Sequence, residues 1–242
     1  MPELSHAIRL LQEVPLFRGL DAVGLSAVAR AAQSCRIERG EYFFKQEAIA
    51  DIVYVLHHGR VKLIQATPEG LHVVFRFLGP GELFGPMAAF EGQVYPVSAQ
   101  AVRWCQALCW KGPTMAGLME TYPRIAINAV RELAARLRSL RDLYRELATE
   151  RVERRVAHAL LRLADQAGWK TEHGVLIDMP LSRQDLAEMT GTTLYTVSRI
   201  LSGWQRDGLL DIGRQRVTIL DSPGLIAIAA DLPKVKAERR DI

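Results

Sequence analysis

The feature that most constrains this chain is a run of apolar residues with coiled-coil spacing near its middle. These residues recur at alternating intervals of four and three over about three heptads, with arginine and glutamate among the intervening positions. The run comprises Ala126, Val130, Leu133, Leu137, Leu140, Tyr144 and Leu147. We predict one long helix over residues 123–149, beginning at Pro123, because proline lacks the amide hydrogen that a first helical turn cannot use.

An apolar stripe this narrow is buried only when it meets a matching stripe. We therefore predict that two copies of the chain pair in parallel along this helix and form a homodimer. The alternative is a helix that packs on the β domain of its own chain. The predicted dimer interface comprises Val130, Leu133, Leu137, Leu140, Tyr144 and Leu147.

Residues 36–111, ahead of the long helix, have the pattern of β structure. Short β-branched and aromatic runs are separated by turn residues there. Evenly spaced glycines mark the turns, at Gly59, Gly70, Gly81 and Gly92. Such spacing is typical of an all-β sandwich, jelly roll or barrel. Short helical patterns at residues 8–11 and 20–32 precede this β structure.

The stretch after the long helix mixes helical and strand patterns. An amphipathic helix near residues 152–163 is followed by a polar stretch, residues 166–174, which we predict to be a loop. A short strand ends at Pro180, and two helical segments and a small β-hairpin follow. The fold class is therefore α+β. The predicted domains are residues 1–122 (β-rich), 123–149 (dimerisation helix) and 150–225, with a charged tail at 226–242.

Helix-capping residues and a glycine separate the two helical segments. Ser182 and Asp185 have the spacing of a capping box, and Gly191 suits a tight turn. Thr192 or Thr193 can then cap the second segment. One face of that segment is apolar, and the other carries hydroxyl and guanidinium groups, which bind phosphates and guanine edges in a major groove.

The sequence thus predicts a helix-turn-helix whose second helix reads DNA, with the basic hairpin as a wing over the DNA backbone. The alternative is a generic helical hairpin with a solvated polar face. The predicted DNA-binding residues are Ser182, Arg183, Gln184, Thr193, Tyr195, Thr196, Ser198, Arg199, Arg214 and Arg216.

Composition and motifs narrow the class of protein. The 242 residues carry a formal net charge of +4. This charge is compatible with nucleic-acid binding, but it is weak evidence for that function by itself. Because the sequence has no long apolar run and no signal peptide, we expect a soluble, cytoplasmic protein that does not associate with a membrane. Three cysteines form no paired framework, so we expect buried structural thiols and no metal site. Since no catalytic motif occurs, we do not expect an enzyme.

The segments GRVKL, GPGELFG and SRQDLAEMTGTTLYTVSRIL, together with the heptad helix, resemble the CRP/FNR family of bacterial transcription regulators. The resemblance covers roughly residues 14–225, and the helix-turn-helix is its most specific part. It implies a β-roll sensor domain of the cyclic-nucleotide-binding type, a dimerisation helix and a winged helix-turn-helix. It also implies a homodimer on two-fold symmetric double-stranded DNA. In activators of the family, the loop at residues 166–174 contacts RNA polymerase.

The resemblance also assigns roles within the second helix. Arg199 matches the family's arginine that contacts guanine. Tyr195 stands where both the cAMP receptor protein and FNR keep a glutamate, and Leu194 stands where the cAMP receptor protein has another arginine. Because a tyrosine cannot accept from cytosine as a carboxylate does, we expect a half-site that differs from those of both relatives.

The resemblance places an effector pocket in the β-roll, but the residues that hold cAMP in relatives are missing. Pro86 follows Gly85 where a glutamate would bind the ribose, and no arginine for the phosphate occurs near residues 95–98. Leu140 and Arg141 replace the Thr-Ser pair that contacts the nucleobase. We therefore do not expect cAMP. The predicted effector pocket comprises Phe84, Gly85, Pro86, Met87, Ser98, Leu137 and Leu140.

The sequence alone does not identify the effector. No cysteine precedes Cys35, so we expect no iron–sulfur cluster of the FNR type. The stretches YPVSAQAV and TTLYTVSRILSGW are similar to the nitrogen-oxide-responsive DNR and NnrR branches, which implies nitric oxide sensing through haem. The candidate haem ligands are His6, His57, His58 and His72. The alternatives are a regulator that needs no ligand and a β-roll module that controls a partner protein.

Overall fold

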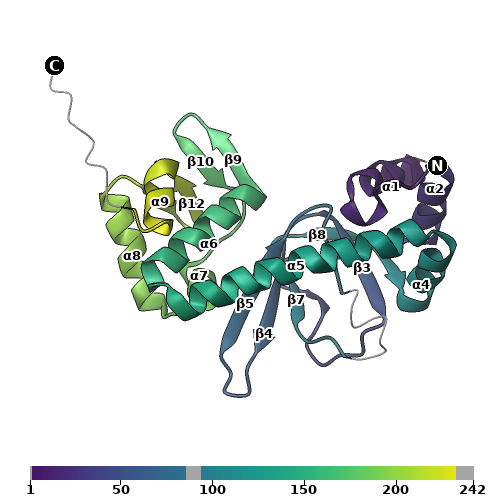
Figure 1. Cartoon of the computed structure of the whole chain (residues 1–242), viewed down its shortest axis with the longest axis horizontal. Coiled ribbons are helices and arrows are strands. Elements are labelled where there is room, and N and C mark those ends of the chain that lie inside the picture. The colour runs from purple at the N-terminus through teal and green to yellow at the C-terminus, as the bar shows by residue number, and fades with distance from the viewer. Residues whose placement is uncertain (1, 86–93, 233–242) are drawn as a thin grey trace. The chain divides into compact units, whose positions relative to one another are not determined.

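The structure is a computed structural model that describes residues 2–85 and 94–232. It divides into two compact units, Met1–Asp142 and Leu143–Ile242, and the division falls inside the long helix α5 (Pro123–Thr149). Figure 1 shows strands packed with helices in both units. This mixture of helix and sheet confirms the predicted α+β fold class, and α5 begins at Pro123 as predicted.

Two four-stranded antiparallel sheets form the β-roll of the first unit. Their strand orders are β1-β8-β3-β6 and β2-β7-β4-β5, so most neighbouring strands are distant in the sequence. The strands are β1 (Gln33–Ile37), β2 (Tyr42–Phe44), β3 (Ile52–His58), β4 (Val61–Ala66), β5 (His72–Leu78), β6 (Leu83–Phe84), β7 (Ser98–Ala101) and β8 (Cys105–Lys111).

The evenly spaced glycines mark turns of the roll. Gly59, Gly70 and Gly81 have positive φ angles of 99°, 80° and 84°. At Gly59, a Cβ atom would stand 2.5 Å from the carbonyl oxygen of Trp104, so only glycine fits this turn. Gly92 lies outside the described residues.

Aromatic rings form much of the interior of the β-roll. Phe44 stacks on Tyr95 with ring centroids 3.8 Å apart, and Tyr54 stacks on Phe84 at 5.0 Å. The hydroxyl of Tyr95 donates to the carbonyl oxygen of Ile52 at 2.9 Å, which satisfies its polar group within the core.

The three cysteines are free thiols on β1 and β8. Cys105 and Cys109 are buried in the same interior cluster, because residues four apart on a strand face the same way. Cys35 is only half-buried. A hydrogen bond with Cys109 and burial raise the pKa of the Cys35 thiol, so this group is protonated at neutral pH.

Helices cover one side of the roll and enclose a second core. They are α1 (Pro2–Glu13), η1 (Pro15–Phe17), α2 (Ala22–Ala31) and α4 (Gly112–Thr121). The buried indole of Trp110 donates to the carbonyl oxygen of Val28 in α2 at 2.9 Å. The buried amide of Asn128 donates to the carbonyl oxygens of Leu16 and Arg18, which fixes α5 against η1.

The second unit is built around helix α6 (Val152–Ala167), whose apolar face is buried at Val156, Leu160 and Leu163. Its sheet has the strand order β11-β12-β10-β9. The remaining elements are β9 (Gly168–Thr171), β10 (Gly174–Ile177), α7 (Arg183–Thr190), α8 (Leu194–Arg206), β11 (Leu210–Gly213), β12 (Arg216–Ile219) and α9 (Ser222–Ala229). Within the described part of the chain, no helix is long and apolar enough to cross a membrane.

Two sequence predictions in this unit need correction. The predicted loop at residues 166–174 comprises instead the last two residues of α6, strand β9 and the turn into β10. β9 pairs with β10, and β10 pairs with β12. The predicted tail begins too early, since α9 runs to Ala229 and buries Leu225 and Ala229. The apolar run at residues 225–229 supplies this face, which a frayed tail would leave exposed.

Candidate nucleic-acid interface

The start of α7 and the start of α8 are fixed by side-chain caps. Ser182 Oγ accepts from the amide of Asp185 at 3.0 Å, and the Asp185 carboxylate accepts from the amide of Ser182 at 3.0 Å. Gly191 then adopts the left-handed conformation (φ 59°, ψ 47°), and Thr193 caps α8 by accepting from the amide of Thr196. The predicted capping box, turn and second cap are confirmed.

Helix α8 is divided into a buried and an exposed face. Val197, Leu201 and Trp204 are buried, and the Trp204 indole donates to the Glu153 carboxylate of α6 at 3.2 Å. Tyr195 on the other face is 77% exposed. The buried face fixes α8 on its neighbours and leaves the polar face free for a partner.

The structure brings the predicted recognition residues of α8 together on its exposed side. Thr193 and Arg199 are exposed, while Thr196 and Ser198 are half-buried. The hydroxyls of Thr193 and Thr196 lie 2.9 Å apart. The guanidinium of Arg199 makes no hydrogen bond or ion pair with the residues that the structure describes, so it can bind a ligand at little cost in broken contacts.

The predicted DNA-binding residues at the start of α7 differ in whether their side chains already have hydrogen-bonding partners within the protein. Ser182 uses its hydroxyl in the cap, and Gln184 donates to the Glu188 carboxylate at 2.8 Å. Arg183 is exposed and, among the described residues, has no hydrogen-bonding or ion-pair partner.

The β11–β12 hairpin forms the predicted wing. Arg214 and Arg216 are exposed on it, and Gln215 at its tip has a positive φ of 56°. The carbonyl oxygen of Gln215 accepts from the amide of Leu181, which ties the wing to the start of α7. A groove runs between these elements, lined by Leu181, Ser182, Arg183, Gln184, Leu186, Leu194, Leu201, Ile212, Gly213, Arg214, Gln215 and Val217.

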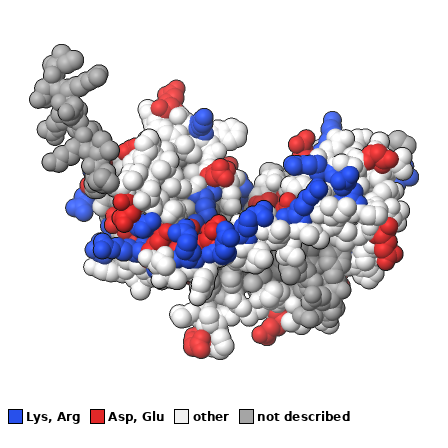
Figure 2. Space-filling view, viewed as in Figure 1, with Lys and Arg blue, Asp and Glu red and all other residues white. Residues whose placement is uncertain are grey.

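Helix α5 exposes six of the seven residues of the apolar stripe that the sequence predicts, and the seventh, Ala126, is half-buried. Leu137 is 67% exposed and Tyr144 is 75% exposed, which is unusual for large apolar side chains in one row. The exposed members are Val130, Leu133, Leu137, Leu140, Tyr144 and Leu147. Figure 2 shows Lys and Arg side chains gathered along α5, which carries exposed Arg131, Arg138, Arg141 and Arg145.

The predicted effector-pocket residues do not gather around one described cavity. Phe84 is buried in the aromatic core, and Ser98 Oγ already accepts from the amide of Gln46 at 2.9 Å. Gly85 has a positive φ of 78°, and Leu137 and Leu140 are exposed on α5. Pro86 and Met87 lie outside the described residues.

A different cavity of about 160 Å³ lies between α5, the β-roll and helices η1 and α4. Arg136 of α5 borders it and donates to the carbonyl oxygen of Leu83 at 2.6 Å. Burial, and then the charge of Arg76, lower the pKa of Arg136. Sequence reasoning missed this cavity, which is lined by Leu16, Val53, Leu83, Met115, Met119, Ala129, Val130, Glu132, Leu133 and Arg136.

The four candidate haem ligands lie elsewhere. His6 and His57 contact one another, with their Nε2 atoms 2.9 Å apart, and His58 stacks on Trp104. His72 is exposed at the start of β5. No histidine lines the 160 Å³ cavity, so these described residues do not fit a haem with a histidine ligand in that cavity. Among the described residues, no three His, Cys, Asp or Glu side chains cluster as a metal site.

A β-roll, a long exposed helix and a winged helix-turn-helix define a class of protein: a DNA-binding regulator with a sensor domain. Comparison with known families agrees. Residues 154–228 match the Crp-like helix-turn-helix domain, and residues 34–122 match the cyclic nucleotide-binding domain.

Individual relatives cover nearly all of the chain. The "Cyclic AMP receptor protein" of Thermus thermophilus is 30% identical over 219 residues, 90% of this chain and 98% of that protein. The "Transcriptional activator protein FnrA" of Stutzerimonas stutzeri is 25% identical over 193 residues, 80% of this chain and 79% of that protein. A solved CRP-family transcriptional regulator from Thermus thermophilus has a TM-score of 0.70 at 27% identity, covering 82% of this chain and 97% of that chain.

The chain belongs to the CRP/FNR family of transcription regulators. It is a DNA-binding regulator with a cyclic-nucleotide-binding-like sensor domain, and the proteins of this class are not enzymes.

Proposed function

We propose that the chain acts as a homodimer that binds a two-fold symmetric duplex site, with one α8 helix in each half-site. The observation that carries this proposal is the exposed polar face of α8, where Arg199 and Tyr195 are exposed beside the capped turn. Arg183, Arg214 and Arg216 flank this face, and because none of them has an ion-pair partner among the described residues, their charges suit phosphate contacts. Because its proposed ligand is duplex DNA, we propose that it acts in the cytoplasm.

The exposed stripe of α5 supports the dimer. Its apolar side chains would be removed from water by the same stripe of a second copy, which is favourable in proportion to the area buried. A parallel pair would present two α8 helices, and half-sites about 34 Å apart would place them in successive major grooves.

We propose that the effector of the β-roll is not a cyclic nucleotide. Pro86 and Leu140 stand where the resemblance requires polar partners, and Phe84 is part of a stacked aromatic core. The effector would act by shifting the population of dimer-helix arrangements. Nitric oxide sensing through haem rests on the resemblance alone, and the positions of the histidines do not support it. The alternative to a gated regulator is one that needs no ligand.

If the protein is an activator, we propose that it contacts RNA polymerase through the β9–β10 hairpin. Trp169 on this hairpin is 69% exposed, and an exposed large aromatic side chain is typical of protein interfaces.

The test begins with selection of duplexes from a random-sequence library on the wild-type protein. Arg199→Ala should lower affinity for the selected duplex by about 1–3 kcal/mol and leave affinity for a scrambled duplex nearly unchanged. Arg206→Ala is the matched control, because it removes an exposed arginine from the other end of the same helix. If Arg199→Ala bound both duplexes as the wild type does, α8 would not be the reading helix.

A further inference from the structure

Three consecutive side chains in the first turn of α6 each bond to a different element of the second unit. Glu153 accepts from Trp204 of α8 at 3.2 Å. Arg154 donates to the carbonyl oxygen of Ala229, at the end of α9, at 3.1 Å. Arg155 donates to carbonyl oxygens of the turn between α7 and α8. The start of α6 is therefore the point at which the helices of this unit are joined.

Arg155 makes the most direct connection to the recognition helix. Its Nε donates to the carbonyl oxygen of Thr190 at 3.0 Å, and one Nη donates to that of Gly191 at 3.4 Å. Its other Nη donates to the carbonyl oxygen of Glu150 at 3.1 Å. The carbonyl groups of Thr190 and Gly191 lie at the C-terminal end of α7. Backbone acceptors there lack helical N–H partners, and the helix dipole favours a cation. One planar guanidinium thus joins the α5–α6 turn to the residues just before α8.

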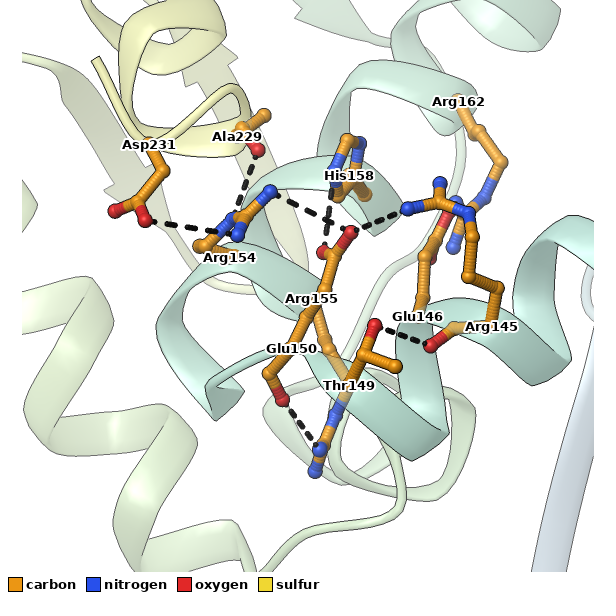
Figure 3. Close-up of polar contacts among 10 residues, drawn as sticks. All are labelled: Arg145, Glu146, Thr149, Glu150, Arg154, Arg155, His158, Arg162, Ala229 and Asp231. Carbon is orange, nitrogen blue, oxygen red and sulfur yellow. Dashed lines mark hydrogen bonds and ion pairs between the residues drawn. The ribbon is translucent and has the colours of Figure 1, made fainter.

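The α5–α6 turn is itself held by a buried carboxylate. The Glu150 side chain is 3% exposed and lies within 3.1 Å of Arg145, 3.5 Å of Arg154 and 3.3 Å of His158. Figure 3 shows these side chains converging on Glu150 from α5 and α6. A buried carboxylate is stable only when it is paired, so Glu150 fixes the turn whose carbonyl oxygen Arg155 binds.

We infer that Arg155 is a positioning residue for sequence-specific DNA binding. Base-edge hydrogen bonds require the recognition helix at a defined position, whereas phosphate contacts tolerate small displacements. Arg155 fixes the turn before Thr193, the cap of α8, relative to the α5–α6 turn. The inference rests on the proposed function and adds a residue that need not touch DNA.

The test compares Arg155→Gln with Arg162→Gln on full-length protein. One Nη of Arg162 in α6 donates to both carboxylate oxygens of Glu146, at 2.7 and 2.8 Å. Because Arg162 makes no hydrogen bond to the α7–α8 turn among the described residues, its substitution matches the loss of a part-buried guanidinium. The duplex probes are the one selected on the wild type and its scrambled counterpart. Affinity is measured as a function of salt, at a temperature where thermal unfolding shows each variant to be folded.

Arg155→Gln should lower the ratio of selected to scrambled affinity by roughly tenfold, about the value of one charge-assisted hydrogen bond. The slope of log affinity against log salt should stay unchanged, because no phosphate contact is removed. Arg162→Gln should keep the wild-type ratio. Arg155→Lys should recover only part of it, since one ammonium cannot span three carbonyl oxygens.

Several results would overturn the inference. If both Arg155 variants kept the wild-type ratio of selected to scrambled affinity, Arg155 would contribute to stability alone. If Arg162→Gln lowered this ratio as much as Arg155→Gln does, the effect would come from the loss of any arginine contact in this unit. A salt slope reduced by about 0.9 would make Arg155 a phosphate contact. If the wild type selected no duplex at all, the proposed function would fail first, and the inference would fall with it.

Discussion

At the scale of single residues, the role of a polar side chain depends on whether the fold already uses it. Ser182 and Arg199 both carry groups that can bind DNA, yet the Ser182 hydroxyl is occupied by the capping box and the Arg199 guanidinium is free of partners among the described residues. Ser182 can therefore offer DNA little beyond its backbone position at the start of α7, while Arg199 offers its whole donor set.

The His6–His57 contact predicts a pH dependence of stability in the first unit. Burial first, and then the nearby charges of His6 and His58, lower the pKa of His57 below 6.5. The unfolded chain therefore binds more protons than the folded chain as pH falls below about 6.5, so the free energy of unfolding decreases through that range. The stabilisation is complete above pH 6.5 and is lost as pH falls through the lowered pKa.

Urea denaturation at pH 8 and pH 5.5 would measure this effect. His57→Gln should show a smaller loss of unfolding free energy between the two pH values than the wild type, because it removes one of the groups that titrates. His72→Gln is the control, since His72 is exposed in the same unit. Equal losses in the wild type and His57→Gln would contradict the lowered pKa of His57.

At the scale of elements, two glycines of the helix-turn-helix differ in the backbone conformation that they adopt. Gly191 has a φ of 59°, and a Cβ atom there would lie 3.3 Å from Leu147 Cδ2. Gly203 lies inside α8, and a Cβ atom there would meet nothing within 4 Å. The same substitution therefore has opposite effects at the two positions.

Gly191→Ala should lower the free energy of unfolding by about 1–2 kcal/mol, the cost of a left-handed conformation for an L-residue. Gly203→Ala should raise it by roughly 0.5–1 kcal/mol, because alanine favours a helix interior over glycine. Urea denaturation of both variants beside the wild type measures the difference. A stable Gly191→Ala protein would show that the turn can adopt another conformation.

The sequence predicted elements whose signals are local. The capping box, the glycine turn and the start of α5 at Pro123 each depend on residues within a few positions of one another. Strand β9 was missed because its polar residues show no alternation, whereas its partner β10 falls within the short strand that the sequence predicts to end at Pro180. The contacts of Arg155 with Thr190 and Gly191 could not be predicted, because these partners lie 35 and 36 residues along the chain.

The cavity beside Arg136 shows the same limit in the sensor. Its lining comes from η1, β3, β6, α4 and α5, so no single segment of sequence contains a recognisable part of it. The predicted pocket was instead transferred by resemblance, and two of its residues, Pro86 and Met87, lie outside the described part of the chain.

At the scale of the whole molecule, the proposed dimer along the exposed stripe of α5 would be required for tight DNA binding. One α8 helix would contact only one half-site, whereas the proposed dimer would bind two half-sites, with the second contact made at high effective concentration. Loss of the dimer should therefore weaken binding to the selected two-fold site far more than binding to an isolated half-site.

Leu137→Asp places a charge at the centre of the stripe, where Leu137 is 67% exposed in the single chain. We expect this variant to sediment as a monomer, because an unpaired carboxylate inside an apolar seam loses its hydration without gaining a partner. Its affinity for the two-fold site should fall by roughly 10²-fold or more, towards that of a half-site. Ser139→Asp, which adds the same charge to an exposed α5 position outside the stripe, should remain a dimer. If Leu137→Asp still sedimented as a dimer, the two copies would meet through another surface, and the geometry of two parallel α5 helices would have to be abandoned.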